Sequence, residues 1–588
     1  MSTTTTPATR WGRVRQALAP HAVGLALCVS YVLVLARTAR HLGFARDEGF
    51  YFQAARSYAG WIQLLLTNRH EALTRGAIDA AWGINHEHPS LMKSLFGISW
   101  LFLHQRWHWI SQESLAFRLP GMILGGVGLW LTYLFGRRAY GHREGLFAAL
   151  ALALMPRVFY HAHLDCFDVP VMTMWIAVLY CYWRSLAGGV GWAVMTGVVF
   201  GLALETKHNA WFVPFLVVAH FIATRGGDMK RDASRGNFPV PLALLAMAIL
   251  GPLIFVGLWP WMWFDTLQTP AHGPGRLAEY VSFHTNHAYY NMEFLGYNYF
   301  RPPFPRTYSW GMILFTVPAI TLVLAAIGLV ARLPAMLREM SWVASLLPRV
   351  TERVPWLARV RGFGAARETD DTRGTATLVF MGFLVPLAPW FSAKTPIFGG
   401  TKHWFPAYPF LALMAGVGFV LVAKRFEATL RDRMTREWLP ATVLGVVLLL
   451  PPLAQTAHSH PFGLSNYTPI VGGAPGAADV GLNRQFWGFT TGSLVPWFNA
   501  HAREGAGVYI HDTTYDSWEM MQRDGYLRPD LRAVWQVSEA DFSIVHHELH
   551  MNEVDYQIWT AYQSPATAEV LAYDGVPIVS VYARAAQP

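Results

Sequence analysis

Eleven apolar blocks constrain the fold of this 588-residue chain more than any other feature. Most are about 17 to 25 residues long, the length that a helix needs to cross ~30 Å of hydrocarbon. Hydrophobic residues make up 53% of the chain and charged residues 14%, whereas a soluble protein carries about 25% charged residues. We therefore predict a polytopic α-helical membrane protein. The predicted spans are residues 21–40, 115–136, 145–160, 170–184, 190–206, 210–224, 239–259, 309–331, 375–391, 404–423 and 438–455.

Basic residues between the spans predict the orientation of the chain. With the N-terminus in the cytoplasm, the cytoplasmic connections hold 24 Lys and Arg and the longer outer loops hold 12. This asymmetry follows the positive-inside rule, so the net charge of +9 indicates topology and not nucleic-acid binding. Arg37, Arg40 and Arg157, near outer ends, are exceptions.

Two segments outside the spans are also apolar in part. Residues 91–103 are too short to cross the membrane, so we predict a helix in the outer interface. A tilted twelfth span is the alternative, and it would place the later basic loops outside. Residues 332–374 are basic and amphipathic, which predicts a helix on the inner leaflet.

The hydropathy pattern changes after residue 455. Short β-branched and aromatic runs such as GVYIHD, RAVWQV, DFSIVHH and VPIVSVYARA alternate with the helix-like DSWEMMQRDG and DYQIWTAYQS. This pattern predicts a small C-terminal α/β domain in the periplasm. It has six basic and fourteen acidic side chains, and we find no second acidic and basic cluster in it. The predicted parts are a cytoplasmic arm (1–20), a transmembrane module (21–455, with a first outer loop at 41–114) and the C-terminal domain (456–588).

Two acidic groups fall on the predicted outer side. Asp47 and Glu48 directly follow the first span, and Asp165 and Asp168 lie between the third and fourth spans. An Asp-Glu pair at a helix end is often only a solvated boundary. Ionisable side chains at membrane depth, however, are costly and mark functional sites. We therefore expect these carboxylates to belong to a site.

A metal site is one interpretation of the segment between these spans. His161, His163 and Asp165 alternate, and in an extended segment their side chains would point the same way and could hold a divalent cation. The alternative is that both histidines are neutral interfacial residues. We expect activity to require no metal or other cofactor, because nearby Lys and His side chains can offset a phosphate charge.

Basic side chains lie on the same predicted side. They are Lys93 and His88 in the first outer loop, Lys207 between the fifth and sixth spans, and Lys402 and His403 before the tenth. Lysines at a bilayer surface often only extend toward headgroups. An acidic centre surrounded by Lys and His can, however, hold a phosphate leaving group while a carboxylate deprotonates an acceptor hydroxyl.

Six motifs appear in order over residues 20–425. They are RDEGFYF, HEHPSLMK, AFRLPGMILG, HLDCFDVPVMTMW, GLALETKHNAW and KHWFPAYPFLALMAG. Their order and spacing resemble the GT-C-fold glycosyltransferases of family 39, the superfamily of protein mannosyltransferases and aminoarabinose transferases. The chain departs from that pattern at Ser90, where a second proline is usual, and at Lys402-His403, which replace Arg-Tyr.

The resemblance implies transfer of a sugar, with inversion, from a polyprenyl-phosphate donor to a lipid, glycan or protein on the outer face of the cytoplasmic membrane. It implies Asp47 as general base, Glu48 as a residue that orients acceptor or donor, and Asp168 in the same cavity. The donor phosphate ligands would be Lys93, Lys207, Lys402 and His403. The other cavity residues would be His88, Asp165 and Arg118.

Two other classes of function compete with an enzyme. A transporter or lipid flippase would also have many spans, but such proteins tend to show internal repeats and charges near the midplane. A binding scaffold would leave the Asp-Glu loop unexplained. Convergence of Asp47, Glu48, Asp168 and Lys402 on one cavity would favour the enzyme.

Overall fold

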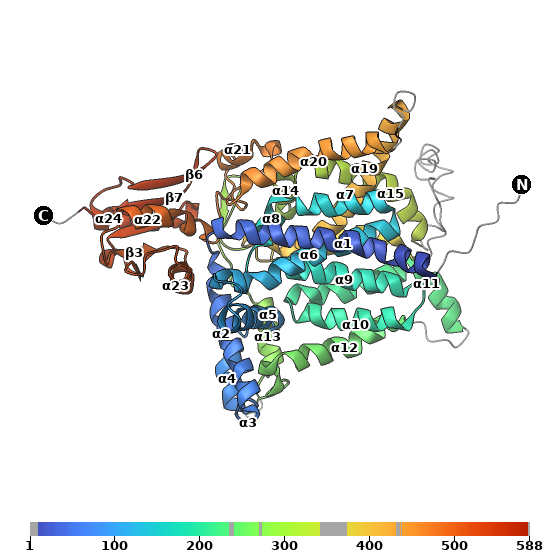
Figure 1. Cartoon of the computed structure of the whole chain (residues 1–588), viewed down its shortest axis with the longest axis horizontal. Coiled ribbons are helices and arrows are strands. Elements are labelled where there is room, and N and C mark those ends of the chain that lie inside the picture. The colour runs from blue at the N-terminus through green and yellow to red at the C-terminus, as the bar shows by residue number, and fades with distance from the viewer. Residues whose placement is uncertain are drawn as a thin grey trace, which may run out of the picture.

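The computed structural model describes residues 10–234, 240–269, 273–340, 373–430, 436 and 438–585. Long helices run side by side, and a small sheet lies at the end of this bundle opposite the start of α1 (Figure 1). The helices that coincide with the predicted apolar blocks are α1 (Arg10–Thr38), α6 (Glu113–Ala139), α7 (His142–Ala153), α8 (Pro156–His161), α9 (Asp168–Ser185), α10 (Val190–Leu204), α11 (Val213–Ser234), α12 (Leu242–Leu258), α14 (Tyr308–Thr316), α15 (Ala319–Glu339), α18 (Thr375–Leu384), α19 (Tyr408–Leu430) and α20 (Leu439–Ser459).

Five described segments are long and apolar enough to cross a membrane, as in a multi-pass protein. They are Leu18–His41, Glu113–Ala139, Ala319–Glu339, Gly400–Leu430 and Leu439–Ser459. Three shorter apolar helical segments, Val190–Leu204, Leu242–Leu258 and Thr375–Phe391, accompany them. The count of eleven spans stays a prediction.

Prolines divide three of the predicted spans. The 145–160 block is α7 followed by α8, which begins at Pro156. Within the 309–331 block, α14 ends at Thr316 and α15 begins after Pro318. The third, 375–391, changes from α18 to a 3-10 helix (Val385–Phe391) that contains Pro386 and Pro389. Proline has no amide hydrogen to donate, so the α-helical ladder is interrupted at these points.

Glycines allow the bundle helices to pack closely. A Cβ atom added at Gly418 of α19 would lie 1.9 Å from the Leu324 carbonyl oxygen of α15. One added at Gly328 of α15 would lie 1.9 Å from the Met414 carbonyl oxygen of α19. Backbones can approach in this way only where side chains are absent, as is typical of helix contacts in membranes.

The connections at the sheet end of the bundle are themselves folded. They contain α2 (Arg46–Thr67), α3 (Arg69–Ala72), α4 (Arg75–Trp82), α5 (Leu91–Ser99), α13 (Arg276–Thr285) and the antiparallel pair β1 (Met292–Phe294) and β2 (Tyr297–Tyr299). Helices α2 and α4 run across the direction of the bundle (Figure 1). The run predicted to lie in the interface is α5, followed by a π-helix over Trp100–Arg106. Of the predicted amphipathic segment, residues 341–372 lie outside the described residues.

A five-stranded mixed sheet forms the C-terminal part. Its order is β4-β3-β5-β7-β6, with β3 parallel to β4 and β5, and β7 antiparallel to β5 and β6. The predicted runs coincide with strands and helices, and β6 was not predicted. The elements are β3 (Gly507–Ile510), α23 (Tyr515–Arg523), β4 (Arg532–Val534), β5 (Phe542–His546), α24 (Asn552–Tyr562), β6 (Glu569–Tyr573) and β7 (Val576–Ala583), preceded by α22 (Val495–His501).

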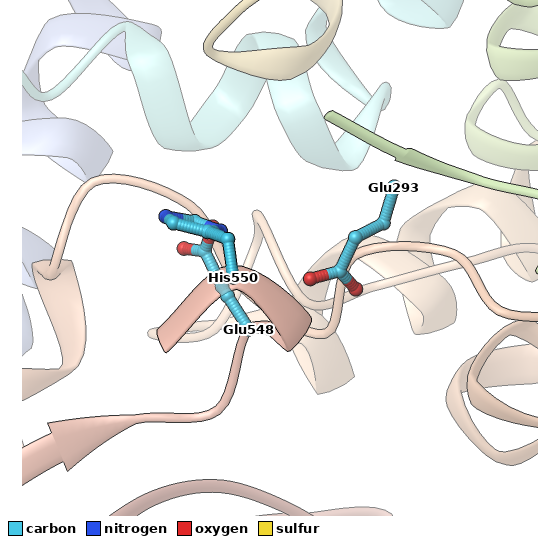
Figure 2. A group of neighbouring side chains, drawn as sticks. All are labelled: Glu293, Glu548 and His550. Atoms are coloured by element: carbon cyan, nitrogen blue, oxygen red, sulfur yellow. The ribbon is translucent and has the colours of Figure 1, made fainter. Parts of the chain in front are cut away.

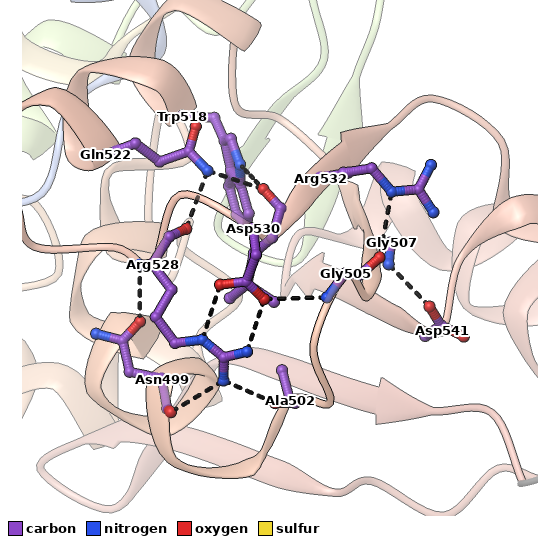
Figure 3. A network of polar contacts seen from close by, with 11 residues as sticks. Asn499, Ala502, Gly505, Gly507, Trp518, Gln522, Arg528, Asp530, Arg532 and Asp541 are labelled. Atoms are coloured by element: carbon purple, nitrogen blue, oxygen red, sulfur yellow. Dashed lines mark hydrogen bonds and ion pairs between the residues drawn. The ribbon is translucent and has the colours of Figure 1, made fainter.

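Arg528 holds the loop between α23 and β4 in place (Figure 3). Its guanidinium donates to both carboxylate oxygens of Asp530, at 3.0 and 2.7 Å, and to the Ala502 carbonyl at 2.8 Å. Asp530 in turn accepts the Gly505 amide at 3.0 Å. Two parallel hydrogen bonds between a guanidinium and a carboxylate fix the orientation of the two groups as well as their distance. The loop is therefore held firmly between α22 and the sheet.

Polar contacts attach the C-terminal part to the bundle. The Asp524 carboxylate accepts the Glu113 amide at 2.7 Å and also a hydrogen bond from the Ser114 hydroxyl. These groups begin α6, so the carboxylate meets the positive end of that helix. Arg46, at the start of α2, pairs with Asp512 at 2.7 Å. The sheet is therefore held over the ends of α2 and α6.

Candidate active site

A cavity of 960 Å³ lies where the ends of the bundle helices meet the C-terminal part. Aromatic rings, among them Trp211, Phe283 and Trp487, alternate along its wall with polar groups. A mixed lining of this kind suits an amphiphile or a sugar. The acidic, basic and histidine side chains on its wall are Arg46, Asp47, Glu87, His88, Asp168, Lys207, His208, His284, His287, Lys402, His403, Asp512, Glu548 and His550.

Asp47 and Lys402 form the first of two ion pairs in this cavity. Asp47 is the second residue of α2, so its charge is favoured by the helix N-terminus. The Lys402 ammonium lies 3.1 Å from Asp47 Oδ2 and 3.7 Å from the centre of the Trp487 ring. The Asp47 side chain is 22% exposed and that of Lys402 is 7% exposed. The carboxylate can therefore still be approached from the cavity.

Asp168 and Lys207 form the second pair. Asp168 begins α9, and the Lys207 ammonium donates to its Oδ1 at 2.5 Å. His161 Nδ1 is 3.6 Å from the other oxygen. Four predicted site residues from four distant segments thus line one cavity, and the predicted His88 and His403 line it too.

Glu48 is not among the described residues that line the cavity, and its role in orienting acceptor or donor stays a prediction. Its side chain is fully buried and receives Arg118 Nε at 2.7 Å and an Arg118 terminal nitrogen at 2.8 Å. It also accepts the amides of Ala45 at 2.9 Å and Asp165 at 3.0 Å. Consecutive residues of a helix point about 100° apart, so Asp47 faces the cavity while Glu48 faces the bundle. Glu48 positions the loop and does not touch the cavity.

Arg118 and Asp165 share this buried environment and are not among the described cavity-lining residues. Arg118 donates to the Gly43 carbonyl at 2.8 Å as well as to Glu48. Burial raises the pKa of Asp165 well above its usual value. Both residues lie in the buried cluster around Glu48, and their predicted place in the cavity has no support in the cavity lining.

Lys93 is also placed differently from the prediction. Its ammonium donates to the carbonyls of Asn85 and, at 2.8 Å, His88, and lies 5.2 Å from the centre of the Tyr58 ring. It is fully buried, and burial lowers its pKa to about 7. Lys93 shapes the loop that carries His88 and does not line the cavity, so it is not placed to bind phosphate there.

His161, His163 and Asp165 are not among the groups of described residues whose ligand atoms lie close enough to hold a metal ion. His161 ends α8 and a turn follows, so the segment is not extended as the alternation required. His163 is instead bonded to the Phe159 carbonyl and the Thr38 hydroxyl, both at 2.8 Å, and stacks on His460. The structure therefore offers no support for a metal held by His161, His163 and Asp165.

Another group in the described part of the chain can hold a divalent cation. Ligand atoms of Glu293, Glu548 and His550 lie within 4.8 Å of one another (Figure 2). Gln485 donates to Glu548 at 2.6 Å. Burial raises the pKa of both glutamates. Glu548 and His550 thus share a titratable cluster with Glu293, which stands 255 and 257 positions earlier in the chain, and no sequence signal links them.

Arg46 and Asp512 are cavity residues that sequence reasoning missed. Their ion pair joins the first residue of α2 to the segment after β3. Burial raises the pKa of Asp512 to about 6 although Arg46 opposes the shift. Arg46 stands beside Asp47 in the RDEGFYF motif, which was an available signal, whereas nothing local marked Asp512.

Comparisons with known proteins agree with the motifs. Residues 109–256 match the family model described as dolichyl-phosphate-mannose-protein mannosyltransferase. The predicted family resemblance is confirmed. No curated protein matches the chain.

Solved structures are similar to most of the chain. The apo ArnT of Cupriavidus metallidurans is 15% identical, with 95% of this chain and 98% of that one covered and a TM-score of 0.45. The same protein bound to undecaprenyl phosphate is 14% identical, with 96% and 98% covered and a TM-score of 0.43. The Archaeoglobus fulgidus oligosaccharyltransferase in its apo form is 10% identical, with 92% and 72% covered and a TM-score of 0.46.

Proposed function

We propose that this chain is an integral-membrane glycosyltransferase that moves a sugar from a polyprenyl-phosphate donor to an acceptor hydroxyl. The observation that carries the proposal is the pair of carboxylate–ammonium contacts, Asp47–Lys402 and Asp168–Lys207, on the wall of one cavity. The matched family model, whose description names a dolichyl-phosphate-linked sugar, supports the class of donor.

In this proposal Asp47 accepts a proton, and Lys402 and Lys207 bind the donor phosphate. A phosphate that enters the cavity competes with Asp47 for Lys402, since an ammonium and a phosphate attract strongly where water is excluded. The Asp47 carboxylate is then free to accept the proton of the acceptor hydroxyl. Lys402 and Lys207, with His403 beside them, offset the charge of the departing phosphate. Attack opposite the leaving phosphate inverts the anomeric carbon.

The C-terminal part covers the cavity and selects the acceptor in this proposal. Asp512, Glu548 and His550 line the cavity from this part, while Lys207 and His403 come from the bundle. An acceptor that approaches past the sheet meets the acidic groups, and the lipid donor reaches the lysines from the bundle. The donor, a lipid, glycan or protein acceptor, and membrane lipids are the proposed partners.

The proposed setting is the outer face of the cytoplasmic membrane. Basic residues between the apolar segments favour a cytoplasmic N-terminus. The sheet lies at the bundle end opposite the start of α1 (Figure 1), which fits a periplasmic C-terminal domain. A transporter or flippase is the alternative function, and the position of the charged pairs in a cavity at the bundle end favours the transferase.

Mass spectrometry of membrane lipids and glycans tests the proposal. Cells that lack the gene should lose one glycosylated product and accumulate a polyprenyl-phosphate sugar, and the Asp47→Asn variant should not restore the product. Purified protein in liposomes should convert the accumulated lipid to free polyprenyl phosphate when the acceptor is present. Movement of that lipid across the bilayer without cleavage of the sugar would establish the flippase instead.

A further inference from the structure

Three side chains that can bind a metal ion meet where the C-terminal part contacts the connections of the bundle. Glu293 lies in β1, while Glu548 and His550 belong to the turn around the 3-10 helix Leu549–Met551. One ligand atom of each lies within 4.8 Å of the other two. Figure 2 shows Glu548 and His550 together, with the Glu293 carboxylate directed toward them. Glu548 and His550 also line the cavity, which gives an ion a path to the cluster.

The two glutamates have no basic partner among the described residues. Glu293 is 5% exposed and the Glu548 side chain is 8% exposed. Arg46 is already paired with Asp512, and Arg484 forms no ion pair with either glutamate within the described ranges. Burial raises the pKa of both glutamates, and each carboxylate disfavours the charge of the other. Two buried carboxylates side by side are costly without a positive charge, and a divalent cation would supply it.

Two neighbouring side chains have free ligand atoms. Burial lowers the pKa of His550, so its imidazole is neutral, which is the form that binds metal. Its Nδ1 lies 3.5 Å from a Glu548 oxygen and has no hydrogen-bond partner in the described part of the chain. Gln485 is fully buried, and its amide nitrogen donates to Glu548 at 2.6 Å while its amide oxygen has no partner among those residues. A half-turn of this amide exchanges its oxygen and nitrogen, so the oxygen can become a further ligand.

We propose that Glu293, Glu548 and His550 bind one divalent cation, with the Gln485 amide oxygen as an additional ligand. A histidine nitrogen with carboxylate oxygens suits Zn²⁺, whereas Mg²⁺ favours oxygen ligands. The cation joins β1 to the segment after β5 and therefore helps to hold the C-terminal part beside the cavity. The inference goes beyond the proposed transfer reaction, because no step of that reaction passes through the cation.

Zinc binding to the purified full-length protein tests the site. The protein is stripped with EDTA, freed of chelator and titrated with Zn²⁺, and bound zinc is counted by plasma mass spectrometry. The variants are Glu293→Gln and His550→Gln. The control is Glu279→Gln, because Glu279 lies 2.9 Å from His86 but belongs to no group of three ligands in the described part.

We expect the wild type and the control to bind one more Zn²⁺ than either variant, or the variants to bind it about tenfold or more weakly. Zinc held by surface histidines is common to all four proteins and cancels in this comparison. Mg²⁺ should displace the ion only at much higher concentration. Equal zinc content and equal affinity in the wild type and Glu293→Gln would overturn the inference.

Thermal unfolding separates loss of the ion from damage to the fold. Zn²⁺ should raise the midpoint of the wild type and the control but not that of Glu293→Gln. Gln at this position can still accept the Leu549 amide and removes one of two neighbouring carboxylates, so without metal its midpoint should equal or exceed that of the wild type. A wild-type midpoint that Zn²⁺ leaves unchanged would contradict the proposal. If Glu293→Gln does not fold, His550→Gln gives the same comparison. No donor is present, so neither result depends on the proposed transfer.

Discussion

Substituting Glu48 by Gln should unfold the protein more readily and should not act on catalysis directly. Glu48 is fully buried and accepts two hydrogen bonds from Arg118 and two from backbone amides, all between 2.7 and 3.0 Å. Gln keeps the shape but leaves the Arg118 guanidinium, 2% exposed, without a counter-charge. Breaking a buried pair from one side costs about 3–5 kcal/mol, so we expect a loss of that size.

Unfolding by denaturant in mixed micelles, followed by tryptophan fluorescence, measures this loss. The matched control is the neighbouring Asp47→Asn, which should lower the free energy of unfolding by less than Glu48→Gln does, because Asp47 is 22% exposed. Combining Glu48→Gln with Arg118→Met should cost less than the sum of the single changes, because the unpaired cation is gone. A Glu48→Gln protein that is as stable as wild type but inactive would show that Glu48 acts on substrate, and would refute this reasoning.

Four further outcomes are expected. Lys207→Met should raise the KM for donor about tenfold or more, and more than Lys93→Met does, because Lys93 acts on the cavity only through the loop that carries His88; initial rates at varied donor concentration measure both. Asp512→Asn should lower acceptor transfer while donor binding, measured by equilibrium titration, is retained. Because the pKa of Asp512 is raised to about 6, its pair with Arg46 exists above that pH, so the transfer rate should fall as pH drops through 6, and Asp512→Asn should flatten that limb. EDTA should leave initial rates unchanged.

The helical part of the fold could be predicted because its signal is local. Each apolar block coincides with helix in the described part of the chain. The rise per residue of a helix sets how many apolar residues are needed to cross the membrane, so a run of that length predicts a helix. The prolines at 156 and 318 indicate helix breaks from the sequence alone, but the predicted spans run through them. Strand β6 was missed because EVLAY is a five-residue run in which apolar and polar residues do not alternate, and periodicity alone cannot assign such a short run to a strand.

The site was predicted in part, and the failures have a physical cause. Motif order identified Asp47, Asp168 and Lys402, because each stands at or near the start of a helical segment that opens on the cavity. Sequence adjacency could not show that Glu48 faces the other way. Nor could it show that Lys93 would be held by loop carbonyls.

Contacts between distant segments were beyond the reach of sequence patterns. Asp512 reaches the cavity only because the C-terminal part docks on α2 through Arg46. Glu293 meets Glu548 and His550 for the same reason (Figure 2). Their spacing in the chain carries no periodicity, and only the folded arrangement brings them together.

The most direct test of the account is single-turnover transfer by Asp47→Asn in liposomes with a defined polyprenyl-phosphate sugar and its acceptor. The account predicts a loss of about 10²-fold or more in the transfer rate, with donor affinity equal to or higher than that of the wild type, because no carboxylate then competes with the phosphate for Lys402. Near-normal transfer by the Asn variant would contradict the claim that the Asp47 carboxylate, released from Lys402, is the base.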